Sequence, residues 1–396
     1  MLNIKKDKGK SISEVLIYFA SKTTAHGFSH LASSYQKCVT LFWSFVISCS
    51  FIALFYHVIS IVKTFISFGV TESYSAEMDK AIYPDITVCN IQEISLSNVE
   101  RNLNILKQFN LTLDDIETKP TQNIFLKLGR KNSQIFGHQL EDLILNCTFA
   151  GKTCTLADFT IIQTPGYFNC FTFTGHINEI NDNLLPGPHN GLSLITFKEE
   201  GFISKTDKTY NHLSTIENAD GIWIVIHEKN SMPVVEENGL DVSTGFSITI
   251  SLVQERYNRL GWPYGTCKTT LDKNNYLRYT SYTQIHCWQA CKYRAEMAIC
   301  NCTNLAAVPI EENKSQVCMF YEDMNDQLEA VSCAEKMVEK HGGKWEANCF
   351  RKCSWACSEV HYLKTLNQAR WSYRNTKLDF VMKYLLRRPD KEKLFA

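Results

Sequence analysis

Cysteine is the residue type whose number and spacing in this chain could support the most chemistry. The chain has 16 cysteines, and all of them except Cys38 and Cys49 follow residue 62. Clustered cysteines bind zinc, carry redox chemistry as a CxxC pair, or form disulfides. The stretch "CSWAC", which ends at Cys357, does not have the CxxC spacing. An even number of cysteines after a long apolar segment is typical of disulfides in an oxidising compartment, so we expect disulfides and no metal site.

The sequence lacks the motifs of common enzyme classes. His227 and Glu228 are followed by Ser231 where the HExxH zinc motif needs a second histidine, and we expect a strand end there. No GxSxG, P-loop or dinucleotide-binding fingerprint is present. The 41 basic and 41 acidic residues balance, without the clustered Lys and Arg that a nucleic-acid surface needs. We therefore expect no enzyme, no cofactor and no nucleic-acid partner.

One apolar segment is long enough to cross a membrane. Val39 to Val62 contains no Asp, Glu, Lys or Arg, and Lys37 and Lys63 flank it. As a helix it covers about 36 Å, against about 30 Å for a bilayer core. A signal peptide has a shorter apolar core and a shorter leader. We predict a transmembrane helix over residues 39–63, and no second span, because "LDFVMKYLL" (378–386) is short and interrupted by lysine.

The charges around this segment predict its orientation. Six lysines precede it, and the residues after it carry mixed charges; the lysines are Lys5, Lys6, Lys8, Lys10, Lys22 and Lys37. The positive-inside rule then places the N-terminus in the cytosol and the rest of the chain outside the plasma membrane. Four glycosylation sequons on the outer side agree with this, at Asn110, Asn146, Asn301 and Asn313.

Apolar periodicity predicts an α+β protein. A short amphipathic helix with Val15, Leu16 and Phe19 on one face precedes the turn "AHG" (25–27). Helical patterns dominate residues 91–145, including "VERNLNILKQF" (99–109). Extended or β-branched segments predict strands at "YPDITVCN" (83–90), "GLSLITF" (191–197), "GIWIVIHE" (221–228) and "GFSITISLV" (245–253). We expect turns at "LPGPHNG" (185–191) and "WPYG" (262–265).

The spacing of the cysteines between residues 267 and 357 predicts a pair of helices. Cys287 and Cys291 lie one helical turn apart, and "CFRKCSWAC" repeats that spacing at Cys349, Cys353 and Cys357. Two helices with a cysteine stripe each can be joined rung by rung in antiparallel fashion. Four further cysteines would then close the connecting loops, namely Cys300, Cys302, Cys318 and Cys333.

Several motifs together resemble the degenerin/epithelial sodium channel family, the amiloride-sensitive sodium channels. They are "AHG" before the apolar segment, "YPDITVCN" after it, "GPHNGLSL", "WPYGTC" and the 14 outer cysteines. The resemblance runs from about residue 11 to 386. "CNIQEISL", "YFNCFTF" and "SMP" are most similar to the FMRFamide peptide-gated branch.

The resemblance implies a large disulfide-rich α+β ectodomain of the palm, finger, thumb and β-ball type. The implied regions are a cytosolic gating tail (1–38), the membrane helix (39–63), a palm strand (64–90), a finger-like region (91–185), palm and knuckle strands (186–266), a cysteine-rich thumb (267–360) and a return toward the palm (361–396). The implied disulfides are Cys89–Cys170, Cys147–Cys154, Cys267–Cys357, Cys287–Cys353, Cys291–Cys349, Cys300–Cys333 and Cys302–Cys318.

The resemblance also implies roles for single residues. His26 and Gly27 correspond to the family's gating motif, where a re-entrant turn lines the pore; an ordinary helix-ending glycine is the alternative. Tyr264 would contact an aromatic residue after the first span, with Phe68 as the expected partner and Phe65 or Tyr74 as alternatives. A peptide ligand would need an aromatic cleft, for which Phe168 and Phe171 are candidates, although core packing is the more frequent role for such residues.

The family's second span, with a Gly/Ser-x-Ser selectivity filter and the amiloride site, is not in this sequence, which stops at "RRPDKEKLFA". We expect an incomplete subunit of a trimeric, ligand-gated, sodium-selective channel, with sodium ions, other subunits, the lipid bilayer and an extracellular peptide as partners. Two alternatives are a truncated, non-conducting regulatory subunit and a single-span peptide-binding receptor.

Overall fold

The computed structural model divides the chain into two compact units, Met1–Ser75 and Ala76–Ala396. It describes residues 11–33, 36–76, 83–118, 121–174, 187, 190–198, 221–269, 281–302, 333, 344–371 and 383. The segment "LDFVMKYLL" and most of the loop between Cys302 and the last helix lie outside these residues.

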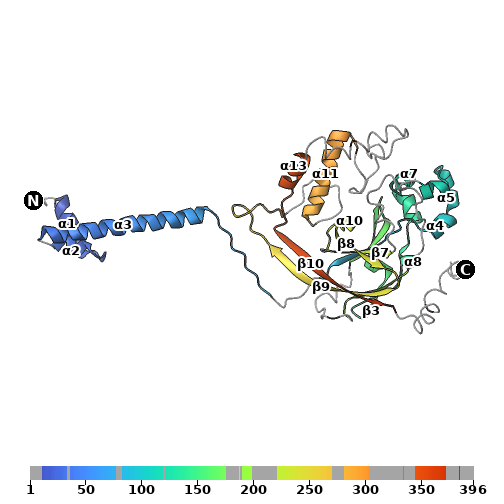
Figure 1. The fold of residues 1–396 in the computed structure, drawn as a ribbon, viewed down its shortest axis with the longest axis horizontal. Coiled ribbons are helices and arrows are strands. Elements are labelled where there is room, and N and C mark those ends of the chain that lie inside the picture. Colours follow the sequence, from blue (N-terminus) through green and yellow to red (C-terminus); the bar gives the residue numbers. More distant parts are fainter. Residues whose placement is uncertain are drawn as a thin grey trace, which may run out of the picture. The chain divides into compact units, whose positions relative to one another are not determined.

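The described residues of the first unit form three helices, with α1 and α2 gathered at the N-terminal end of α3 (Figure 1). Their bounds are α1 (Ile12–Lys22), α2 (Phe28–Ser33) and α3 (Lys37–Ile66). None of the 30 residues of α3 is buried by the chain, although most of them are apolar. Among the described residues, α3 alone is long and apolar enough to cross a membrane. It extends the predicted span slightly at both ends, because the helix continues through the flanking lysines.

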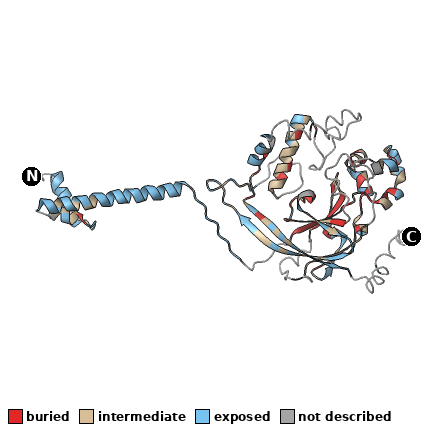
Figure 2. Cartoon of the chain, viewed as in Figure 1, coloured by how far each residue is buried: buried red, intermediate tan, exposed pale blue. Residues whose placement is uncertain are grey.

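A five-stranded antiparallel sheet holds the core of the second unit, in the order β4-β5-β1-β7-β8. The strands are β1 (Asp85–Asn90), β4 (Phe159–Thr164), β5 (Phe168–Phe173), β7 (Gly221–His227) and β8 (Gly239–Ser243). All residues of β1 and β5 are buried, as the red strands of Figure 2 show. Even the polar position Thr87 is buried, because its hydroxyl bonds with Thr172 at 2.7 Å and with His227 at 2.9 Å.

Short helices pack beside this sheet. They are α4 (Leu96–Arg101), α5 (Leu103–Gln108), α6 (Leu113–Thr118), α7 (Thr121–Phe136) and α8 (Leu140–Leu143). The single helix expected over 99–109 is two helices, because the chain breaks at Asn102, whose side-chain amide donates to the Asn98 carbonyl at 2.8 Å. The apolar spacing still identified the core face, since Val99 and Leu106 are buried.

The described residues form two smaller sheets as well. One has the order β3-β2-β6, with β2 (Ile144–Phe149), β3 (Lys152–Thr153) and β6 (Leu192–Thr196). The other, which we call the ribbon, pairs β9 (Phe246–Asn258) with β10 (Ser358–Arg370) along their full length. Ile248, Ile250 and Leu252 of β9 are half-buried in alternation, as predicted, whereas Phe246 at the strand end is exposed. The short elements η1 (Leu156–Asp158) and α10 (Val235–Asn238) lie between strands.

The cysteine-rich region contributes two described helices, α11 (Gln284–Cys300) and α13 (Lys344–Lys352). The cysteine spacing predicted one helix through Cys349, Cys353 and Cys357. That prediction is wrong at its end: α13 stops at Lys352, Cys353 follows the helix, and Cys357 lies directly before β10.

Candidate functional site

Disulfides join the cysteines of the second unit in pairs. The described bridges are Cys89–Cys170, Cys147–Cys154, Cys267–Cys357, Cys287–Cys353, Cys291–Cys349 and Cys300–Cys333. Each is a pair that the family resemblance implied. Cys302 is also disulfide-bonded, and its expected partner Cys318 lies outside the described residues. Cys38 and Cys49, both in α3, are free thiols.

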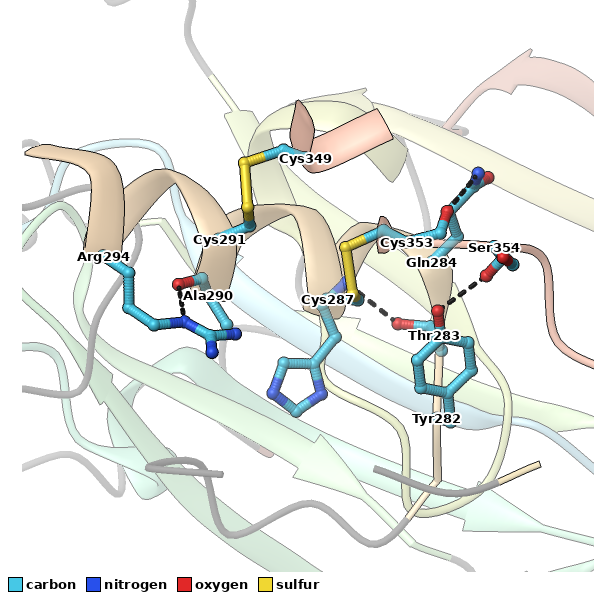
Figure 3. The surroundings of a disulfide bond; sticks show 11 residues. Tyr282, Thr283, Gln284, Cys287, Ala290, Cys291, Arg294, Cys349, Cys353 and Ser354 are labelled. Atoms are coloured by element: carbon cyan, nitrogen blue, oxygen red, sulfur yellow. Dashed lines mark hydrogen bonds between the residues drawn. A yellow bond between two sulfur atoms is a disulfide. The ribbon is translucent and has the colours of Figure 1, made fainter. Parts of the chain in front are cut away.

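Two of these bridges form a ladder between α11 and the end of α13 (Figure 3). Cys287 bonds to Cys353 and Cys291 bonds to Cys349, with Cα atoms 5.6 and 5.7 Å apart. From Cys287 to Cys291 the chain advances along α11, whereas the bonded partners go back from Cys353 to Cys349. The two segments therefore run antiparallel. Cysteines one turn apart lie on the same helix face, which is why both rungs can form.

Hydrogen bonds extend the ladder at the start of α11. The Tyr282 hydroxyl donates to the Ser354 carbonyl at 2.6 Å, and the Gln284 amide donates to the Cys353 carbonyl at 3.0 Å (Figure 3). The Thr283 hydroxyl caps the helix by accepting from the backbone N–H of His286. The chain entering α11 is therefore bound to the chain leaving α13.

The base of the cysteine-rich region is fixed to the ribbon. Cys267 and Cys357 are bridged, the N–H of Arg259 donates to the Cys357 carbonyl at 2.7 Å, and the N–H of Lys268 donates to the Trp355 carbonyl at 2.9 Å. The chain that leaves β9 and the chain that enters β10 are thus held side by side. A movement of α11 and α13 would be transmitted to the ribbon through these bonds.

Arg259 clamps this base from its side chain. Its Nη1 donates to the Ala356 carbonyl at 2.9 Å, and its Nη2 lies 2.6 Å from the Glu359 carboxylate. The guanidinium also lies 5.3 Å from the Tyr257 ring and 5.1 Å from the Trp355 ring. Sequence reasoning missed this residue, because Trp355, Ala356 and Glu359 lie about a hundred positions away and follow no local pattern.

Ionisable groups line the junction of β7 with the ribbon. Burial raises the pKa of Glu228, and the nearby Glu359 carboxylate raises it further, whereas the backbone N–H of Val360 opposes the shift. Burial lowers the pKa of Lys364, whose ammonium donates to the Asn238 carbonyl at 3.1 Å. His227 ends β7, as expected, and burial lowers its pKa to about 4.

The predicted turn at "WPYG" is present at residues 261–265. Its Trp262–Pro263 peptide is cis, and the N–H groups of Tyr264 and Gly265 both donate to the Gly261 carbonyl. Tyr264 is half exposed and Trp262 is 89% exposed. Phe68 follows α3 in the other unit. The contact between Tyr264 and Phe68 therefore stays a prediction.

The predicted gating turn lies between α1 and α2. Gly27 has a φ of +96° and is buried against α3. A Cβ at this position would lie 3.2 Å from Ile47 and 3.4 Å from Trp43, so glycine suits both the backbone conformation and the close approach. His26 is exposed, and His30, which sequence reasoning did not select, stacks on Trp43 at 4.6 Å.

Phe168 and Phe171, the candidate ligand contacts, are both core residues. Phe168 is fully buried and meets Phe125 edge to face, with ring centres 5.3 Å apart. Phe171 is 4% exposed and packs in the sheet core with Ile86 and Val88. This placement favours the core role for both residues over the ligand-binding role.

Three predicted glycosylation sites lie in the described part of the chain. Asn110 and Asn301 are exposed, and both occupy left-handed turns after helices, which leaves their side chains open to an oligosaccharide transferase. Asn146 is half-buried on β2, and Asn313 lies outside the described residues. Within the described ranges, no group of three His, Cys, Asp or Glu residues is placed to hold a metal ion.

The described chain thus combines a helix that is long and apolar enough to cross a membrane with a disulfide-braced α+β unit. Residues 19–394 match the family model of the amiloride-sensitive sodium channel. Because the match covers most of the chain, the protein belongs to this family.

Relatives across the family resemble the chain at similar levels. The FMRFamide-activated amiloride-sensitive sodium channel of Cornu aspersum is 25% identical over 412 residues, which cover 95% of this chain and 64% of the relative. Acid-sensing ion channel 1A of Danio rerio is 25% identical over 72% of this chain and 60% of its own length. Epithelial sodium channel subunit alpha of Xenopus laevis is 26% identical over 67% of this chain and 40% of its own length. The chain spans less than two thirds of each.

Proposed function

We propose that this chain is part of a subunit of a trimeric, ligand-gated, sodium-selective cation channel whose agonist is an extracellular peptide. The family match over residues 19–394 carries the proposal. The peptide agonist is suggested by the FMRFamide-activated relative, whose match covers 95% of this chain.

We infer that the N-terminus lies in the cytosol and that the second unit lies outside the plasma membrane. Two observations support this orientation. The lysines concentrate before α3. The described disulfides all follow α3, whereas Cys38 and Cys49 within it remain thiols, as expected if the second unit matures in an oxidising compartment.

In this proposal the second unit receives the ligand and the cysteine-rich helices act as a lever. The finger-like region is 91–185, palm strands occupy 186–266, and the thumb is 267–360. The ladder makes α11 and α13 one stiff body, and the Arg259 clamp and the Cys267–Cys357 bridge join that body to the ribbon. Tyr264 would pass the movement to Phe68 beyond α3.

The turn at His26 and Gly27 would form the lower part of the ion pathway. The observation that supports this role is the tight contact of Gly27 with α3. This contact would hold the turn at a fixed position beside the membrane helix. A backbone carbonyl of such a turn could face a hydrated cation.

The test is expression of the full-length gene product in oocytes under voltage clamp. FMRFamide and related amidated peptides are applied, sodium is replaced by a large organic cation, and amiloride is added. We expect a peptide-evoked inward current that needs sodium and is blocked by amiloride. Surface biotinylation checks delivery to the membrane, and co-expression with other family subunits checks for a missing partner. Surface-delivered protein that gives no current under any of these conditions would overturn the proposal.

A further inference from the structure

A hollow lies along the disulfide ladder, between α11 and α13. Its volume is about 490 Å³, which is within the range of sites for small organic ligands. It is lined by the four cysteines of the ladder, by Ala295 and Asn348, and by three basic residues. Because the two rungs of the ladder join its walls covalently, the hollow keeps its shape without a ligand.

The charged residues that line the hollow are all basic. They are Lys268, Arg294 and Lys352, and no described carboxylate is among the lining residues. Arg294 and Lys352 are exposed and Lys268 is half-buried, so solvent reaches all three. Within the described ranges, none of the three takes part in a salt bridge. A concave surface with charges of one sign concentrates their electric field, and an anion bound there would neutralise it.

Two of the basic residues lie near the rung that joins Cys287 to Cys353. Lys352 is the last residue of α13 and directly precedes Cys353. Lys268 is paired with Ala356, three residues beyond Cys353, as an isolated bridge between extended segments. Both lysines therefore belong to the end of the hollow at which α13 meets the base of the ribbon.

The third basic residue lies further along α11. Arg294 follows Cys287 by seven residues, which is about 10 Å of helix. Its Nε donates to the Ala290 carbonyl at 3.2 Å, and its two terminal nitrogens have no hydrogen-bond partner among the described residues (Figure 3). Those nitrogens can bind an oxyanion in a two-pronged manner. The hollow thus offers cationic groups at two separate places rather than at one.

We propose that this hollow binds an elongated organic anion with sulfate groups at separate points, as sulfated sugar chains have. A chloride ion or an inorganic sulfate is too small to reach Arg294 and the two lysines together. A nucleoside triphosphate concentrates its charges at one end. The inference uses the proposed location of the second unit outside the cell, where sulfated sugars occur. It depends neither on the peptide agonist nor on channel opening.

The experiment measures binding of a fluorescent heparin tetrasaccharide by its anisotropy. The full chain is produced in a secretory host, purified in a non-ionic detergent with its disulfides intact, and titrated in about 0.15 M sodium chloride. The variants are Lys268→Gln, Arg294→Gln and Lys352→Gln. Arg351→Gln is the matched control, because Arg351 is exposed on the same helix as Lys352 but does not line the hollow.

We expect saturable binding at one site in the wild type. Each of the three variants should bind roughly tenfold more weakly, because each loses one charge-assisted contact, whereas Arg351→Gln should change the affinity less than about twofold. The fully desulfated tetrasaccharide, which has the same length and keeps its carboxylates, should bind roughly a hundredfold more weakly. Unlabelled tetrasaccharide should displace the label at much lower concentrations than adenosine triphosphate or inorganic sulfate.

A second measurement is independent of the folding of the variants. The bound tetrasaccharide should raise the unfolding temperature of the wild type, since it binds the folded chain alone. The charge-preserving variant Lys352→Arg should keep most of the binding.

Three results would overturn the proposal. Wild-type protein that neither binds the tetrasaccharide nor is stabilised by it would show that the hollow is not such a site. Equal losses in Lys352→Gln and Arg351→Gln would show attraction to the general charge of α13. Displacement by adenosine triphosphate or inorganic sulfate as readily as by the tetrasaccharide would show a site for compact anions. None of these results bears on the proposed channel function, which the oocyte recordings test separately.

Discussion

The guanidinium of Arg259 lies 2.6 Å from the carboxylate of Glu359, at the point where the chain enters and leaves the cysteine-rich helices. The Glu359 side chain is 10% exposed and also lies 2.9 Å from Nε2 of His361. A short, partly desolvated charge-assisted contact of this kind restricts the angle between two segments more than a neutral one does. The pair therefore stabilises the geometry of the joint between the helices and the ribbon.

Arg259→Met should lower the free energy of unfolding of the second unit by about 2 kcal/mol, because it removes a hydrogen bond from a charged donor and the ion pair with Glu359. The free energy of unfolding of Arg259→Lys should lie between that of the wild type and that of Arg259→Met. Lysine keeps the positive charge but cannot contact two groups at once through a planar guanidinium. Thermal unfolding of the purified chain measures the effect. Arg294→Met is the matched control, because the exposed Arg294 bonds the Ala290 carbonyl of its own helix (Figure 3). Equal losses in the two Met variants would contradict the clamp.

Removing one rung of the ladder should cost less than the separation of its cysteines suggests. Cys291 and Cys349 are 58 residues apart, but the neighbouring rung already holds their segments together. Replacing either pair by alanine should cost about 2.5 kcal/mol, and replacing both pairs about 6 kcal/mol, because the second removal opens a larger loop. Denaturant unfolding under non-reducing conditions gives the values. Strictly additive losses would show that the rungs act independently.

Gly27→Ala should reduce peptide-evoked current roughly tenfold per channel at the surface, because a side chain at positive φ costs about 1–2 kcal/mol and meets Ile47. Gly69→Ala is the control, since a Cβ there has nothing within 4 Å. Current divided by biotinylated surface protein is the measurement. A normal current from Gly27→Ala would remove the need for glycine in this turn.

Tyr264→Ala and Phe68→Ala should each shift the agonist concentration for half-maximal current, and the double variant should shift it no further than the larger single effect. That non-additivity is expected of residues in direct contact. Trp262→Ala, in the same turn and 89% exposed, serves as the control paired with Phe68→Ala. Additive effects for Tyr264 and Phe68 would argue against their contact.

The stability of the second unit should fall in acid through His227. Its pKa drops from 6.5 to about 4 on folding, so the unfolded chain binds the proton more readily between those values. The contribution of neutral His227 to the free energy of unfolding is complete above pH 6.5 and is lost as the pH falls through 4. The total loss is roughly 3 kcal/mol. The difference in unfolding free energy between the wild type and His227→Gln should be flat above neutral pH and shrink below it. A difference that does not vary with pH would mean that His227 is not buried in its neutral form.

Local patterns in the sequence predicted the elements well wherever a single segment decides its own structure. The apolar run from Val39 to Val62 specifies α3, and Ile248, Ile250 and Leu252 identify the inner face of β9. The i, i+4 cysteines predicted the ladder. The end of α13 could not be read in the same way, because Cys357 continues the spacing although its backbone belongs to the base of the ribbon.

Long-range contacts explain what the sequence did not reveal. The sequence of β1 alternates apolar and polar residues, but the strand is buried on both faces. Ile86 and Val88 lie in one core cluster, and Thr87 on the other face bonds with Thr172 of β5 and His227 of β7. Arg259 and Glu359 carry no motif and meet only when the ribbon forms. Phe168 and Phe171 resemble ligand contacts in sequence, yet the same aromatic character suits the core in which they lie.

The sequence separation of the bridged cysteines also determines when each disulfide can form during synthesis of the chain. Cys147 and Cys154 are 7 residues apart and can pair as soon as both emerge, whereas Cys267 must await Cys357, 90 residues later. At about 5–20 residues per second, that wait lasts roughly 5–20 seconds. During it Cys267, Cys287 and Cys291 emerge as reactive thiols without their partners, and a wrong pairing among them would block the ladder. The cysteine-rich region is therefore the part of the chain whose maturation should depend most on disulfide isomerases of the secretory pathway.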